Sequence, residues 1–73
     1  MNEEVAYRGL TLIAQPFDTE RGWDEHVVIR ATTGDATYEL QTTGPATYQS
    51  REEAVRHAVR YGRLAIDALY SRV

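Results

Sequence analysis

The sequence contains no cysteine, and its 73 residues include one methionine, one tryptophan and one phenylalanine. Without cysteine there is no disulfide framework and no thiolate zinc knuckle, on which small secreted domains usually depend. The fold must rest on a hydrophobic core alone, near the lower size limit for doing so. These absences predict a single domain over residues 1–73, in a cytoplasm-like compartment, with little chain left to enclose an active site.

Lysine is also absent, and eight arginines face eleven acidic residues, for a net charge of −3. Such a chain lacks the general attraction for phosphate backbones, so nucleic acid is an unfavoured partner. The chain opens without a basic segment followed by an apolar one, and its apolar runs are too short to span a bilayer. We therefore expect a soluble, unprocessed protein that does not enter a membrane.

Hydrophobic periodicity predicts an antiparallel sheet of three strands. Three segments alternate apolar and polar residues with the period of a strand: 5–15, 23–31 and 36–41. Residues rich in turn formers separate them, and another loop is expected over 42–46. Trp23 is expected to be at least half buried, because a lone tryptophan in so small a domain is valuable to the core.

The clearest local signal is Ser50-Arg51-Glu52-Glu53, which has the pattern of a helix capping box. In this motif the Ser50 hydroxyl accepts from the Glu53 amide, and the Glu53 carboxylate reaches back to the Ser50 amide. The motif predicts a helix over 51–70. The core-facing stripe of this helix is expected to comprise Val55, Val59, Gly62, Ile66 and Leu69. Gly62 is expected where the helix crosses the sheet closely, because a glycine in mid-helix costs roughly 1 kcal/mol relative to alanine.

These elements predict an α+β fold in which a three-stranded antiparallel sheet packs against one C-terminal helix (β-β-β-α). Short groups of residues along nearly the whole chain resemble those of small uncharacterised proteobacterial proteins: Tyr7-Arg8-Gly9, Pro16, Gly22-Trp23, Ile29, Tyr48, Ser50, Glu52-Glu53-Ala54, Gly62-Arg63 and Ile66-Asp67. The resemblance implies the β-β-β-α layout and no catalytic residue.

The order of elements is also similar to the latter part of double-stranded RNA-binding domains and to the sheet-plus-helix DNA readers of plant transcription factors. The RNA-binding family carries a lysine cluster at the start of its last helix. The predicted helix here begins Arg51-Glu52-Glu53 instead. This departure counts against RNA as a ligand.

The two histidines, His26 and His57, are the candidates for a metal or acid–base site, with Glu25 and Glu53 near them in sequence. No third ligand stands at a recognisable spacing, and Glu53 and His57 have the i,i+4 spacing of a helix surface pair. Ser50 lacks the setting of a nucleophile elbow. Since nothing supplies a nucleophile, a base and oxyanion donors together, we expect a non-enzymatic protein without cofactor or metal.

A second stripe on the predicted helix lies away from the core stripe and comprises His57, Tyr61, Leu64 and Ala68. A leucine and a tyrosine in register on a solvated face indicate a docking surface. The stripe favours an interaction domain that binds a protein partner or forms a homodimer through its helix. Two alternatives stay open. One is nucleic-acid binding by the sheet face, using Arg8, His26 and Arg30 near Tyr7 or Tyr38. The other is a small-ligand or metal-dependent activity at the histidines.

Overall fold

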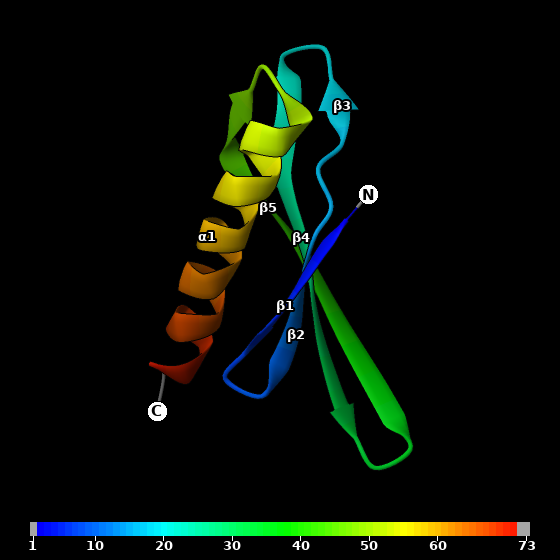
Figure 1. Cartoon of the computed structure of the whole chain (residues 1–73). Coiled ribbons are helices and arrows are strands. Elements are labelled where there is room, and N and C mark those ends of the chain that lie inside the picture. The colour runs from blue at the N-terminus through cyan, green and yellow to red at the C-terminus, as the bar shows by residue number, and fades with distance from the viewer. Residues whose placement is uncertain (1, 72–73) are drawn as a thin grey trace.

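The computed structural model describes residues 2–71 of the chain. It contains one antiparallel sheet of five strands and one helix, in this order (Figure 1): β1 (Glu3–Tyr7), β2 (Leu10–Ala14), β3 (Asp18–Thr19), β4 (Gly22–Thr33), β5 (Ala36–Tyr48) and α1 (Arg51–Tyr70). The predicted α+β class, with an antiparallel sheet and a C-terminal helix, is confirmed. The predicted number of three strands is only roughly right, because two short strands were not foreseen.

The segment predicted as one strand over 5–15 is a hairpin. β1 and β2 pair antiparallel with Tyr7 opposite Leu10, and Arg8 and Gly9 form the turn with φ angles of 52° and 78°. Positive φ at both central residues is the geometry of a type I′ turn, whose twist matches that of the strands it joins. The turn residues are Arg-Gly, and arginine rarely adopts this conformation. The sequence therefore lacks the Asn-Gly signal by which such turns are usually predicted.

β4 is the central strand, with β2 and β3 on one side and β5 on the other. β5 continues through 42–46, where a loop was predicted, and ends at Tyr48. The register shifts between Asp24 and Glu25 of β4, which leaves a bulge in β5 around Pro45. Proline has no N–H to donate to a ladder, and a bulge is one of the few places where a strand accommodates it.

α1 packs on one face of the sheet, chiefly over β4 and β2 (Figure 1). Trp23 lies on this face and is more than half buried, as predicted. The buried apolar core lies between helix and sheet: Leu12, Ala14, Val27, Ile29, Ala58, Val59 and Ile66. Gly62 crosses β2 so closely that a methyl group on it would collide with the Leu12 side chain. The close crossing expected at Gly62 is therefore present.

The helix begins and ends where the capping signal and the periodicity place it. The Ser50 hydroxyl accepts from the Glu53 amide at 3.2 Å. The predicted core stripe is wrong at its C-terminal end, because Leu69 is 47% exposed. The β4–β5 hairpin diverges from the axis of α1 toward its tip, so this hairpin does not cover the last turns of the helix (Figure 1).

Candidate functional site

The structure divides the predicted docking stripe into two parts. The His57 ring stacks on the Tyr48 ring of β5, with centroids 4.3 Å apart and planes at 9°. The Tyr61 hydroxyl lies 2.9 Å from the Thr42 hydroxyl, and its ring packs against the core. The prediction that His57 and Tyr61 point away from the sheet is therefore wrong, because β5 extends under that side of the helix. Leu64, 61% exposed, and Ala68 remain on the surface.

A groove of about 270 Å³ lies between α1 and β5, and Leu64 lines it together with His57 and Tyr61. At its base the Glu25 carboxylate is 6% exposed. Its Oε1 accepts from the Ala46 amide and its Oε2 from the Tyr48 hydroxyl, both at 3.1 Å. These bonds occupy the carboxylate and fix the β5 bulge, which gives Glu25 a structural role.

The buried Glu25 carboxylate affects the neighbouring residues Tyr48 and Gly44. Burial and the hydrogen bond to the Glu25 carboxylate raise the pKa of Tyr48 above its usual value of 10.0. Gly44 lies so close that a Cβ atom on it would be 2.6 Å from Glu25 Oε1. Glycine at 44 therefore makes room for the buried carboxylate.

His26 lies on the other face of the sheet and is 9% exposed. Its ring is tilted by 52° against Phe17 at 4.8 Å, and its Nδ1 is 2.7 Å from the Thr43 hydroxyl. Its buried Nε2 has no hydrogen-bond partner among residues 2–71. The two histidines are separated by the sheet, so they do not share a site. Within the same residues no group of three His, Cys, Asp or Glu side chains is placed to hold a metal ion.

The residues considered for nucleic-acid binding do not share a face either. Arg30 lies on the same helix-free face as His26 and pairs with Glu39 at 2.8 Å. Arg8 pairs with Asp67 at 3.2 Å at the end of the sheet. Two further residues of the set lie on the helix side: Tyr7 packs against the core, and Tyr38 is opposite Ala31 in the ladder.

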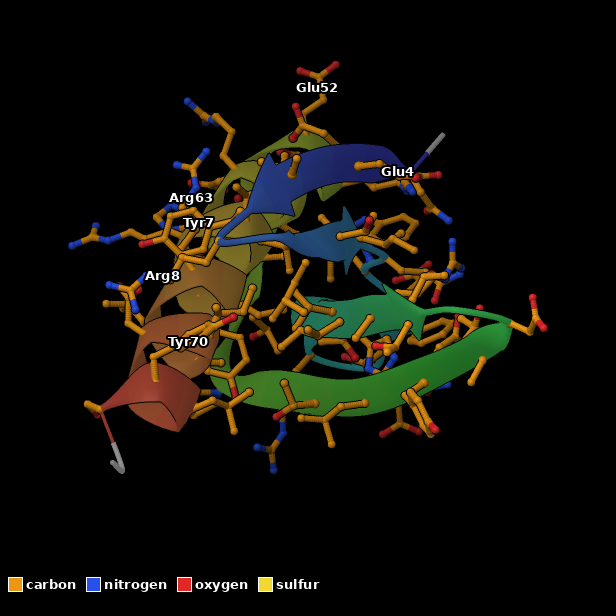
Figure 2. All side chains as sticks on the ribbon, turned by 90° about the horizontal axis from the view of Figure 1, so that it is seen from below. Glu4, Tyr7, Arg8, Glu52, Arg63 and Tyr70 are labelled. Atoms are coloured by element: carbon orange, nitrogen blue, oxygen red, sulfur yellow. The ribbon has the colours of Figure 1, made fainter. Side chains whose placement is uncertain are left out.

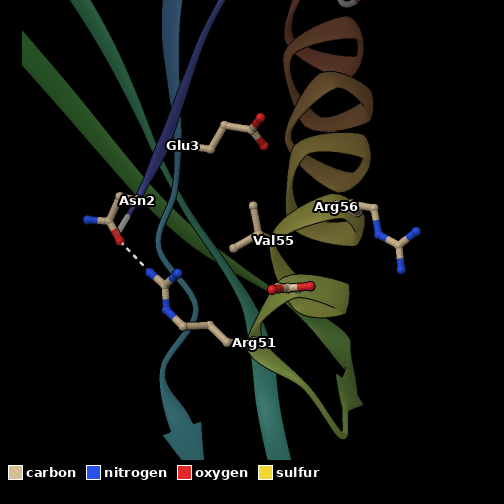
Figure 3. A pocket seen from close by; sticks show the side chains of 6 residues that line it. Asn2, Glu3, Arg51, Val55 and Arg56 are labelled. Atoms are coloured by element: carbon tan, nitrogen blue, oxygen red, sulfur yellow. Dashed lines mark hydrogen bonds between the residues drawn. The ribbon is translucent and has the colours of Figure 1, made fainter.

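Another groove, of about 800 Å³, lies between the start of β1 and the first turns of α1 (Figure 3). Arg51 donates to the Asn2 side-chain carbonyl across it at 2.8 Å. Its charged residues are two carboxylates and two guanidiniums: Glu3, Glu52, Arg51 and Arg56. Because these charges balance, the groove does not indicate a class of ligand.

An apolar surface that sequence reasoning missed lies where the β4–β5 hairpin diverges from α1. A groove of about 240 Å³ opens there, and we call its outer apolar residues the hairpin patch: Leu10, Ala31, Tyr38, Leu40 and Leu69. Tyr38 is 64% exposed and Leu40 is 50% exposed. Both residues lie on the helix side of the sheet, but the helix does not cover them.

The outer edge of β5 is open next to this patch. In the described part of the chain β5 pairs with β4 alone. Its segment 36–43 carries one charged residue, Glu39, which is paired with Arg30. The opposite edge, β1, is five residues long and begins with Glu3 and Glu4. Shortness and charge protect sheet edges from pairing with other chains. The segment 36–43 belongs to a strand of 13 residues, and its one charge is compensated by Arg30.

Within residues 2–71 no helix is both long enough and apolar enough to cross a membrane. Comparison of the chain with known protein families, curated proteins and solved structures finds no match.

Proposed function

We propose that this chain is a non-enzymatic interaction domain that binds a protein partner along the β5 edge and the hairpin patch. One observation carries the proposal: Tyr38, Leu40 and Leu69, each about half exposed or more, line a single groove. Scattered exposed apolar residues are ordinary, whereas a contiguous group beside an open strand edge is typical of a binding site. The absence of cysteine suits a reducing, cytoplasm-like compartment.

The binding mode that fits this surface is strand addition. An extended segment that pairs with the β5 edge gains main-chain hydrogen bonds, and its alternate side chains contact the apolar groove. α1 contributes Leu69 to the groove of the hairpin patch, so the C-terminal helix takes part in binding as one wall of the site. Leu69 is 47% exposed, so this wall is accessible to a partner. The exposed Leu64 lines the separate groove between α1 and β5.

The polar groups of the α1–β5 groove support a role other than catalysis. Glu25 is engaged by Ala46 and Tyr48. His57 is stacked on Tyr48 and Tyr61 is bonded to Thr42. A general acid or base must reach a substrate proton, and these groups instead join the helix to β5.

The test is affinity capture of a protein partner from native extract, followed by a binding measurement with the purified partner. The variants are Leu40→Lys, which places a charge in the patch, and Ala6→Lys, which places the same charge on the exposed surface of β1. We expect Leu40→Lys to weaken binding about tenfold or more, as for a central interface residue, and Ala6→Lys to leave it unchanged. Equal binding by the two variants would overturn the proposal.

A further inference from the structure

We infer that the partner is a second copy of this chain, paired β5 to β5 in antiparallel orientation with Leu40 on the two-fold axis. This inference rests on the proposed function, because it names the occupant of the same edge and patch. It is carried by the order of side chains along residues 36–43, by the charges near them and by the side of the sheet on which they lie.

The side chains of this segment complement themselves when the strand is reversed. A two-fold axis at Leu40 places Thr37 opposite Thr43 of the second copy, Tyr38 opposite Thr42, and Glu39 opposite Gln41. Threonine pairs and pairs of an aromatic with a β-branched residue stabilise antiparallel strands. The glutamine amide is a donor that a glutamate carboxylate accepts. Every cross-strand pair within 37–43 is thus compatible.

Neighbouring registers are less favourable. Opposite residues in an antiparallel pair lie on the same face of the sheet, so a symmetric register has its axis at a residue. An axis at Glu39 sets two carboxylates directly against each other, which destabilises the pair. An axis at Gln41 sets Tyr38 opposite Gly44, where there is no side chain to contact. The axis at Leu40 avoids both defects.

Charge does not oppose this pairing, although the chain has a net charge of −3. Glu39 is the one charged residue within 36–43, and Arg30 of its own chain lies 2.8 Å from it. The centre of the proposed interface is therefore compensated within each copy. The acidic residues Glu3 and Glu4 lie on β1, at the opposite edge of the sheet.

The pairing also covers the hairpin patch. Tyr38 and Leu40 lie on the helix side of the sheet, opposite Ala31 and Ile29 of β4. A two-fold axis perpendicular to the sheet keeps both copies' helix sides together, so the two patches form one apolar strip. Leu64 lines the groove between α1 and β5, on the side of the helix that faces this strip. The interface is isologous and uses the helix, the patch and the edge at once.

The chain has no cysteine, so single-cysteine variants test the register without background. Residues directly opposite in an antiparallel pair have Cα atoms about 4.5–5.5 Å apart, which a disulfide spans. We expect Leu40→Cys to form a covalent dimer of twice the 8.3 kDa monomer mass under mild oxidation. Tyr38→Cys alone should not link, because its symmetric mate is displaced by about 13 Å along the strand. A mixture of Tyr38→Cys and Thr42→Cys should link as a heterodimer.

The wild-type chain is measured in parallel by sedimentation equilibrium. We expect a dimer that Leu40→Lys converts to a folded monomer with an unchanged circular dichroism spectrum, whereas Ala6→Lys stays dimeric. A wild-type chain that is monomeric up to about 1 mM, with Leu40→Cys linking no faster than Ala6→Cys, overturns the inference. So does a dimer in which Leu40→Cys fails to link. In either case the capture experiment with Leu40→Lys and Ala6→Lys still decides whether a different protein occupies the site.

Discussion

The Tyr7 hydroxyl donates to Asp67 Oδ1 at 2.8 Å across 60 positions of the chain. The Arg8 guanidinium lies 3.2 Å from the same oxygen, and the Tyr70 hydroxyl donates to the Arg8 carbonyl at 3.0 Å. Tyr7, Arg8 and Tyr70 lie together beside the last turns of α1 (Figure 2). This Asp67 cluster fastens the β1–β2 turn to the end of a helix that has no basic residue of its own in its last turn.

We predict that Asp67→Asn destabilises the fold by about 0.5–1.5 kcal/mol, because it removes the charge that Arg8 contacts and weakens the acceptor of the Tyr7 bond. The measurement is the urea midpoint at low salt. Glu52→Gln, at the other end of the helix and exposed, is the control for loss of a helix carboxylate. An Asp67→Asn midpoint equal to the wild type would contradict a stabilising role for the cluster.

Ser50→Ala should cost about 1 kcal/mol of the free energy of unfolding, because the Glu53 amide loses its acceptor at the start of α1. Chemical denaturation measures this cost. Gln49→Ala changes the exposed residue just before the cap and should leave the free energy of unfolding nearly unchanged. Equal stability of Ser50→Ala and the wild type would mean that the cap contributes nothing.

Gly62→Ala should destabilise the protein, although alanine stabilises an ordinary helix by about 1 kcal/mol relative to glycine. The added methyl group collides with Leu12, and overpacking of this kind typically costs about 1–3 kcal/mol. The double variant Gly62→Ala/Leu12→Ala should be more stable than the sum of the two single effects predicts. Thermal unfolding of the four proteins measures this coupling, and strict additivity would contradict the close contact.

Stability should fall at alkaline pH because two tyrosines have raised pKa values. The hydrogen bond to the Asp67 carboxylate raises the pKa of Tyr7, and burial with the bond to Glu25 raises that of Tyr48. The folded protein thus retains protons that the unfolded chain releases near pH 10. The stabilisation is complete below about pH 10 and is lost as the pH rises through the raised values.

Tyr48→Phe removes one of these two groups, so its free energy of unfolding should decline less steeply between pH 9 and pH 11 than that of the wild type. Urea denaturation at each pH, with tyrosinate absorbance recorded in parallel, gives the slope. Identical slopes for Tyr48→Phe and the wild type would contradict the role assigned to Tyr48.

Local signals explain what the sequence predicted well. The helix bounds follow from the Ser50 cap and from a period of 3.6 residues that ends near Tyr70. The close crossing at Gly62 follows from the cost of a glycine in mid-helix, which only a steric need offsets. The α+β class follows from alternating segments that precede one amphipathic helix. Each of these inferences needs only residues that are near one another in sequence.

The missed features depend on residues that are distant in sequence. Gly44-Pro45 has the composition of a turn, but the Glu25 carboxylate makes the segment a bulge within β5. The helical periodicity predicts where His57 lies around the helix axis relative to the core stripe. It contains no information on how far β5 extends beneath the side of the helix that carries His57. The hairpin patch arises because hairpin and helix diverge, and that angle is set by the twist of the whole sheet.

The acidic start of β1 bears on how far the proposed dimer could grow. In that dimer the β5 edge of each copy is paired, and the doubled sheet ends on both sides in β1 and the two-residue β3. β1 is five residues long and presents Glu3 and Glu4 to any approaching third chain. In the proposed dimer this short, acidic edge opposes the addition of a third copy and so the growth of a fibril. A mutation that neutralised both glutamates would weaken that protection without changing the proposed interface.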